Sequence, residues 1–107
     1  MNIVVAVPLP VELTSFTANF VENKVSLTWS TATEINNSRF EIEKKTETSE
    51  WIKIGTVDGS GTSAKNHSYS FFDSNVDFVK ATYRIKQIDF DGSYSYSKEV
   101  EVNASAG

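Results

Sequence analysis

The chain has 107 residues, 39% of them hydrophobic and 22% charged, and it contains no cysteine. That length is typical of one domain that buries enough apolar surface to fold without disulfide bonds. The formal net charge of -4 provides no basic footprint for phosphates, so nucleic-acid binding is not expected. The one uncharged aliphatic run, residues 3–7, is too short to span a bilayer.

The first ten residues differ from the rest of the chain. Ile3-Val-Val-Ala-Val7 is followed at once by Pro8 and Pro10, and it lacks the basic leader and cleavage site of a signal peptide. Residues 1–10 are either a tail or short extra strand, or a strand that pairs with an exposed sheet edge and causes self-association through residues 3–7. We favour the first alternative, because the two prolines interrupt any ladder of hydrogen bonds.

From residue 11 onward apolar residues alternate with period two, and no segment shows helical periodicity. The first expected strand, residues 11–20, changes phase between Leu13 and Phe16, which predicts either a β-bulge or a switch of partner strand. The second, residues 25–29, alternates cleanly and points Trp29 to the same side as Leu27. The sequence therefore predicts an all-β domain.

The middle of the chain contains three further strands. Residues 31–38 are polar apart from Ile35 and are expected to form a loop before a strand at 40–43. A strand is expected at 51–57, where the inward position is contested between Trp51 and the two isoleucines that follow it. The Gly- and Ser-rich residues 58–66 predict a mobile connection. Another alternating strand follows at 67–71.

The segment 83–102 predicts a β-hairpin, because Asp91-Gly92 lies between two alternating runs. A two-residue turn there places Phe90 opposite Ser93. The same register sets Tyr83 opposite Val100, Arg84 opposite Glu99, Ile85 opposite Lys98, and Gln87 opposite Tyr96. It predicts an ion pair between Arg84 and Glu99 and an inward-facing Lys98 at a sheet edge, from which a long side chain can reach solvent.

Seven strands with turns between them predict a seven-stranded antiparallel two-sheet sandwich over residues 11–103, followed by a tail at 104–107. The expected core is the inward face of these strands. It consists of Leu13, Val25, Leu27, Trp29, Phe40, Ile42, Tyr69, Phe71, Tyr83, Ile85 and Val100.

Candidate chemistry is sparse. His67 is the single histidine and has no serine on a nucleophile elbow, so we interpret it as structural and expect no enzyme, catalytic residue or cofactor. Asp89 and Asp91 alternate as calcium ligands do, but the other ligands of a calcium loop are absent; we favour a turn and expect no metal, leaving cation binding at this turn open.

Aromatic residues are the stronger functional signal. Trp51, Phe72, Phe90 and Tyr94 do not all fit the core, and exposed rings suit sugar stacking or protein contact. The alternative is that they are isolated apolar residues of an ordinary surface.

Trp29, together with Tyr83-x-Ile85-x-Gln87, resembles the buried Trp and the Tyr-containing strand of fibronectin type III domains, which are immunoglobulin-like sandwiches. Five longer segments resemble the sandwich domain that precedes the C-terminal sorting domain in Bacteroidetes proteins exported by type IX secretion. They are Leu9–Ala18, Leu27–Asn37, Phe40–Lys44, Trp51–Gly55 and Tyr83–Ser93. This resemblance implies a secreted or cell-surface protein of several domains.

The expected function is therefore a non-catalytic accessory, spacer or interaction module whose partners are neighbouring domains of the same protein. The alternative is a carbohydrate-binding module that contacts polysaccharide, or a surface protein, through exposed aromatic side chains.

Overall fold

The computed structural model describes residues 11–104, and every regular element in that range is a β-strand. The strands are β1 (Val11–Val21), β2 (Lys24–Thr46), β3 (Ile52–Ser63), β4 (His67–Asp73), β5 (Lys80–Asp89), β6 (Tyr94–Tyr96) and β7 (Val100–Asn103). All of their pairings are antiparallel, which confirms the all-β, antiparallel prediction. Within residues 11–104 no helix is long and apolar enough to cross a membrane.

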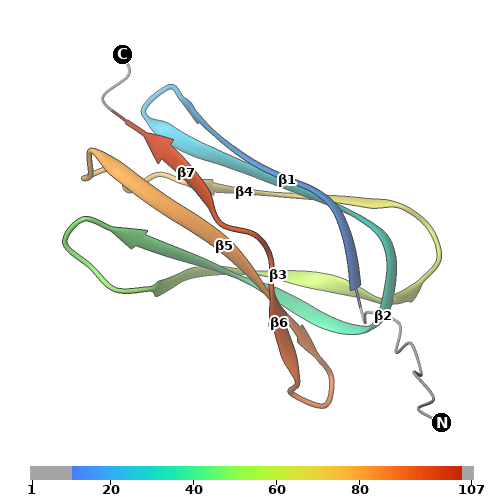
Figure 1. Cartoon of the computed structure of the whole chain (residues 1–107). Helices are drawn as coiled ribbons and strands as arrows, with labels where there is room; N and C mark the ends of the chain where they lie inside the picture. The colour runs from blue at the N-terminus through green and yellow to red at the C-terminus, as the bar shows by residue number, and fades with distance from the viewer. Residues whose placement is uncertain (1–10, 105–107) are drawn as a thin grey trace, which may run out of the picture.

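The long strand β2 organises the fold. Its first half pairs with β1 on one edge and β4 on the other, so that Trp29 lies between Phe16 and Tyr69. Its second half pairs with β3 and β5, and β5 in turn pairs with β6 and β7. All seven strands thus belong to one connected sheet, which curls where β2 bends (Figure 1).

The expected loop at residues 31–38 is wrong, because β2 continues through it. Glu34 is paired with Val11 on one edge and with Ser63 on the other, so the backbone stays in the sheet. The strand bends here: Asn36 has a φ of 53°, and the register with β3 shifts on both sides of Asn37. The polar residues that predicted a loop instead form a bend whose inward side chains are buried.

The core lies inside the curl and joins residues from both halves of β2. Trp29 packs edge-on against Phe40, with ring centroids 5.6 Å apart, and stacks on Tyr69 at 5.8 Å. The buried cluster consists of Phe16, Val25, Leu27, Trp29, Phe40, Ile42, Phe78, Ala81, Tyr83, Ile85 and Val102. Four of the residues expected in the core are partly buried against it: Leu13, Tyr69, Phe71 and Val100.

The bulge in β1 agrees with the sequence prediction, whereas the length of β3 does not. The bulge expected in β1 is confirmed by register shifts on both sides of Leu13. The connection expected at residues 58–66 is too long, since β3 extends to Ser63. The inward position of β3 is taken by Ile54, which packs against the core, whereas Ile52 is 53% exposed.

The hairpin between β5 and β6 has a different register from the one expected. Asp89, not Phe90, lies opposite Ser93: the Asp89 N–H donates to the Ser93 carbonyl at 2.8 Å, and the Gly92 N–H donates to the Asp89 carbonyl at 2.9 Å. Gly92 has a φ of 90°, a left-handed conformation that glycine adopts without strain. The loop therefore has three residues instead of two, and Gln87 lies opposite Ser95, not Tyr96.

The expected register returns farther from the turn, where Tyr83 lies opposite Val100 as predicted. Residues 97–99 leave the sheet, and these three residues face only two residues of β5, which restores the expected register. Ser97 is bonded to Ile85 through both its backbone and its hydroxyl. Two predictions fail for this reason. Lys98 is exposed instead of inward, and Arg84 forms its ion pair with Glu43 instead of Glu99.

The described chain begins and finishes at opposite ends of the molecule (Figure 1). Val11 borders a hollow with Tyr96 and Ser97 at one end. Ala104 lines another hollow with Phe20, at the far end of β1. The two ends are thus separated by nearly the length of β1, which spans roughly 30 Å at ~3.3 Å per residue. Residues 1–10, with both alternatives considered for them, and residues 105–107 lie outside the described range.

Candidate functional site

The outer face of the second half of the sheet carries a row of aromatic and basic side chains. Register places Glu43 beside Arg84, Glu41 beside Lys86, and Lys86 beside Tyr96, so these residues share one face. Tyr94 lies two positions along β6 on that same face. We name the set Trp51, Arg84, Tyr96, Lys86 and Tyr94 the outer ladder.

Arg84 is the centre of the outer ladder. Its guanidinium carbon lies 4.0 Å from the ring centroid of Trp51 and 3.9 Å from that of Tyr96, both favourable cation–π distances. Its Nε donates to Glu43 Oε1 at 2.7 Å, and the Arg84 side chain is only 19% exposed. Arg84 therefore holds two rings in place and is not itself open to a ligand.

Lys86 has a different position. Its Nζ lies 4.2 Å from the ring centroid of Tyr94 and 6.0 Å from that of Tyr96. The nearby carboxylates pair elsewhere, Glu43 with Arg84 and Glu41 with Arg39 and Lys53. Within residues 11–104 no carboxylate forms an ion pair with Lys86, so its ammonium is available for an anionic group.

The four aromatic residues proposed as ligand contacts do not all come together. Trp51 and Tyr94 belong to the outer ladder; Trp51 is half-buried against Arg84, and Tyr94 is 58% exposed. Phe90 is at the tip of the hairpin. Phe72 lies opposite Ser26 on the other half of the sheet, with Lys24 near its ring, so it cannot share a site with the outer ladder.

Tyr96 was missed by the sequence reasoning. The expected register set it opposite Gln87 and hence toward the core, whereas it lies opposite Lys86 on the outer face and is 45% exposed. A one-residue change of register moves every side chain of a strand to the other face. A three-residue turn ending in Gly92 would have been the signal to consider.

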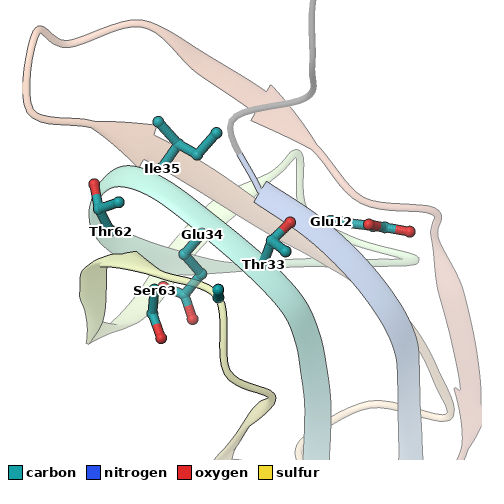
Figure 2. A pocket seen from close by; sticks show the side chains of 7 residues that line it. Glu12, Thr33, Glu34, Ile35, Thr62 and Ser63 are labelled. Carbon is teal, nitrogen blue, oxygen red and sulfur yellow. The ribbon is translucent and has the colours of Figure 1, made fainter.

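The bend of β2 contains a buried carboxylate. Glu34 is 1% exposed and accepts four hydrogen bonds, from Thr31 Oγ1, Asn37 Nδ2, the Ser60 N–H and the Tyr69 hydroxyl. Gln87 extends the network by donating to Asn37 Oδ1 at 3.0 Å. Figure 2 shows Glu34 pointing toward the strand that carries Ser63, while Ile35 points to the other side.

The pKa of Glu34 reflects two opposing effects. Burial disfavours the charged form and raises the pKa, but the hydrogen bonds from Tyr69, Asn37, Ser60 and Thr31 together lower it below its usual value. Burial and the bond to Glu34 in turn raise the pKa of Tyr69 to about 12. An open hollow of about 460 Å³ borders this network (Figure 2). Because the carboxylate is already fully hydrogen-bonded, we assign the network to the structure of the bend.

A second buried polar cluster joins β2, β4 and β5. Lys44 Nζ lies 2.8 Å from Asp73 Oδ2 and donates to the Asn75 carbonyl at 2.6 Å. The Tyr83 hydroxyl donates to the same Asp73 oxygen at 2.6 Å, and burial followed by this bond raises the pKa of Tyr83. Each charged group has a partner, so this cluster also stabilises the fold.

The remaining candidates lie apart from both clusters. His67 is half-buried at the start of β4, and its Nε2 lies 2.8 Å from Ser63 Oγ. Asp91 accepts bonds from the Ser93 N–H and hydroxyl, which lower its pKa and close the turn. Asp89 accepts a bond from Gln87 at 2.8 Å. Among residues 11–104 no three His, Cys, Asp or Glu side chains converge as a metal site.

Comparison with known proteins yields one structural similarity. No protein-family model matches the chain, and no curated protein matches it by sequence. A crystal structure of the pectate lyase Pel3 from Pectobacterium carotovorum superposes with a TM-score of 0.65 over 89% of this chain, at 18% sequence identity. The chain spans 27% of that protein's length. At this identity the similarity concerns the fold alone.

Proposed function

We propose that this chain is a non-catalytic accessory module that spaces or presents neighbouring domains in a secreted or cell-surface bacterial protein. The observation that carries the proposal is the separation of the two ends. Val11 and Ala104 lie at opposite ends of the domain, so a chain that continued in both directions would hold its neighbours apart. Cell-surface location and export by type IX secretion rest on the family resemblance.

The proposal includes an assignment of the fold family. We infer that the curled sheet is a fibronectin type III-like, immunoglobulin-like sandwich in which the bend of β2 merges two sheets. Support comes from the pairing, since the first half of β2 joins β1 and β4 and the second half joins β3 and β5. The contact between Trp29 and Phe40 across the core supports the same assignment.

The spacer function can be tested by placing the domain between two fluorescent reporter proteins and measuring single-molecule energy transfer. A Gly/Ser linker of 107 residues is the control, because it behaves as a random coil. We expect one narrow distance distribution that stays unchanged in urea until the domain unfolds. A distribution as broad as that of the linker would overturn the proposal.

Carbohydrate binding is the second candidate function, and the outer ladder is the observation that favours it. Tyr94 and Tyr96 are exposed, and cations hold the aromatic rings of this face in fixed positions. Titration with polysaccharides can be followed by tryptophan fluorescence, since Trp51 lies in the outer ladder whereas Trp29 is fully buried. We expect Trp51→Phe to abolish the signal; flat titrations of the unmodified protein would reject this function.

A further inference from the structure

The charge of the outer ladder's face differs from that of the whole chain. Register places six basic residues on this face of the sheet: Arg39, Lys45, Lys53, Lys80, Arg84 and Lys86. It places four acidic residues there: Glu41, Glu43, Asp58 and Glu101. The paired strand positions of this face therefore carry a net charge of +2, with Glu47 beside Lys80 at one end, although the chain as a whole carries -4. An anionic ligand is attracted to this face and repelled by the rest of the molecule.

The surroundings of Lys86 indicate which chemical groups a ligand of this face should carry. Its ammonium lies beside Tyr94 and Tyr96, which are 58% and 45% exposed, and it has no carboxylate partner within residues 11–104. A ligand that fits this arrangement has a carboxylate for Lys86 and an apolar ring surface for the tyrosines. A uronic-acid sugar carries both groups on one ring.

We propose that the outer ladder binds an acidic polysaccharide, with Lys86 pairing to a sugar carboxylate and Tyr94 and Tyr96 contacting the sugar rings. The inference rests on the carbohydrate-binding candidate function and names its ligand class. Arg84 is a positioning residue in this site, since Glu43 and two aromatic rings already enclose its guanidinium.

The experiment titrates the protein with polygalacturonate in low-salt buffer and repeats the titration with fully methyl-esterified polygalacturonate and with poly-L-glutamate. We expect the acidic sugar to bind at least about tenfold more tightly than either control polymer, because each lacks the carboxylate or the sugar ring. Added salt should weaken binding, since the contacts with Lys86 are partly exposed.

Two variants and their matched controls locate the site. Lys86→Gln should weaken binding about tenfold, whereas Lys65→Gln, at an exposed lysine outside this face, should leave it unchanged. Tyr94→Ala should also weaken binding, whereas Phe72→Ala, which removes a ring of similar exposure on the other half of the sheet, should not.

The possible results distinguish the acidic-polysaccharide inference from the carbohydrate-binding function on which it rests. Equal binding of the esterified polymer would overturn the acidic ligand and leave carbohydrate binding intact. Equal binding of poly-L-glutamate, or unchanged binding by Lys86→Gln, would also overturn the inference. If no polysaccharide binds, both this inference and the carbohydrate-binding candidate fail, while the spacer function is decided separately by the energy-transfer measurement.

Discussion

The buried carboxylate of Glu34 provides the sharpest test of how the bend of β2 is stabilised. Glu34→Gln keeps the size of the side chain but removes its charge and replaces one of the two accepting oxygens with an NH2 donor. Hydrogen bonds to charged groups contribute ~1.5–3 kcal/mol each and neutral ones ~0.5–1.5 kcal/mol, so the four bonds to Glu34 together lose about 4–6 kcal/mol. Relief of charge burial offsets part of this loss. We expect a net destabilisation of about 2–3 kcal/mol at pH 7.

The pH dependence of this effect has a defined sign. Because the folded-state pKa of Glu34 lies below its ordinary value of 4.5, its ionised form stabilises the fold above pH 4.5. That contribution is lost as the pH falls through the folded-state pKa. The difference in unfolding free energy between the native protein and Glu34→Gln should therefore shrink as the solution becomes more acidic.

Urea denaturation at pH 7 and at several lower pH values measures this difference directly. Glu12→Gln is the matched control, because Glu12 borders the same hollow but is exposed, and it should change stability little. If Glu34→Gln were as stable as the native protein at pH 7, or if the difference did not depend on pH, the assignment of Glu34 to the bend would be refuted.

Two further predictions concern the core. Trp29→Ala should cost ~3–5 kcal/mol, because the side chain is fully buried against Phe40 and Tyr69; an unchanged thermal melt would show that Trp29 does not support the core. Lys44→Met should cost about 3 kcal/mol in urea denaturation, because it leaves Asp73 buried without its cation, and an equal effect of Lys45→Met at the adjacent exposed lysine would contradict that reasoning.

The strands near the middle of the sheet could be predicted from the sequence because their pattern is local. Val25 to Trp29 alternates strictly, and one side of that alternation is fully buried in the structure. The bulge near Leu13 was also predictable, since a phase slip in the apolar pattern has the same origin as a register shift.

The bend at residues 31–38 could not be predicted from local pattern. Thr31, Glu34 and Asn37 are polar, and polar segments usually form loops. Here Glu34 and Asn37 are buried because they find partners on distant strands, namely Ser60, Tyr69 and Gln87, and Thr31 in turn bonds to Glu34. Partners so far apart in the sequence exist only once the sheet has curled.

The outer ladder shows the same division between local and distant information. Trp51 and Tyr94 were recognised as surface aromatics from sequence, but Tyr96 and Arg84 were assigned to the wrong neighbours. For Tyr96 the error came from one residue in the turn at Gly92, which reverses the faces of β6. For Arg84 it came from residues 97–99, which leave the sheet between β6 and β7.

The sequence by itself determined the class of this protein, an all-β antiparallel domain with Trp29 and Tyr83 in its core, because alternation and turn residues act over a few positions. Only the tertiary structure decided which side chains meet. Register across β2, β5 and β6 sets whether a residue faces the core or solvent, and register depends on pairing between strands that the chain brings together only on folding.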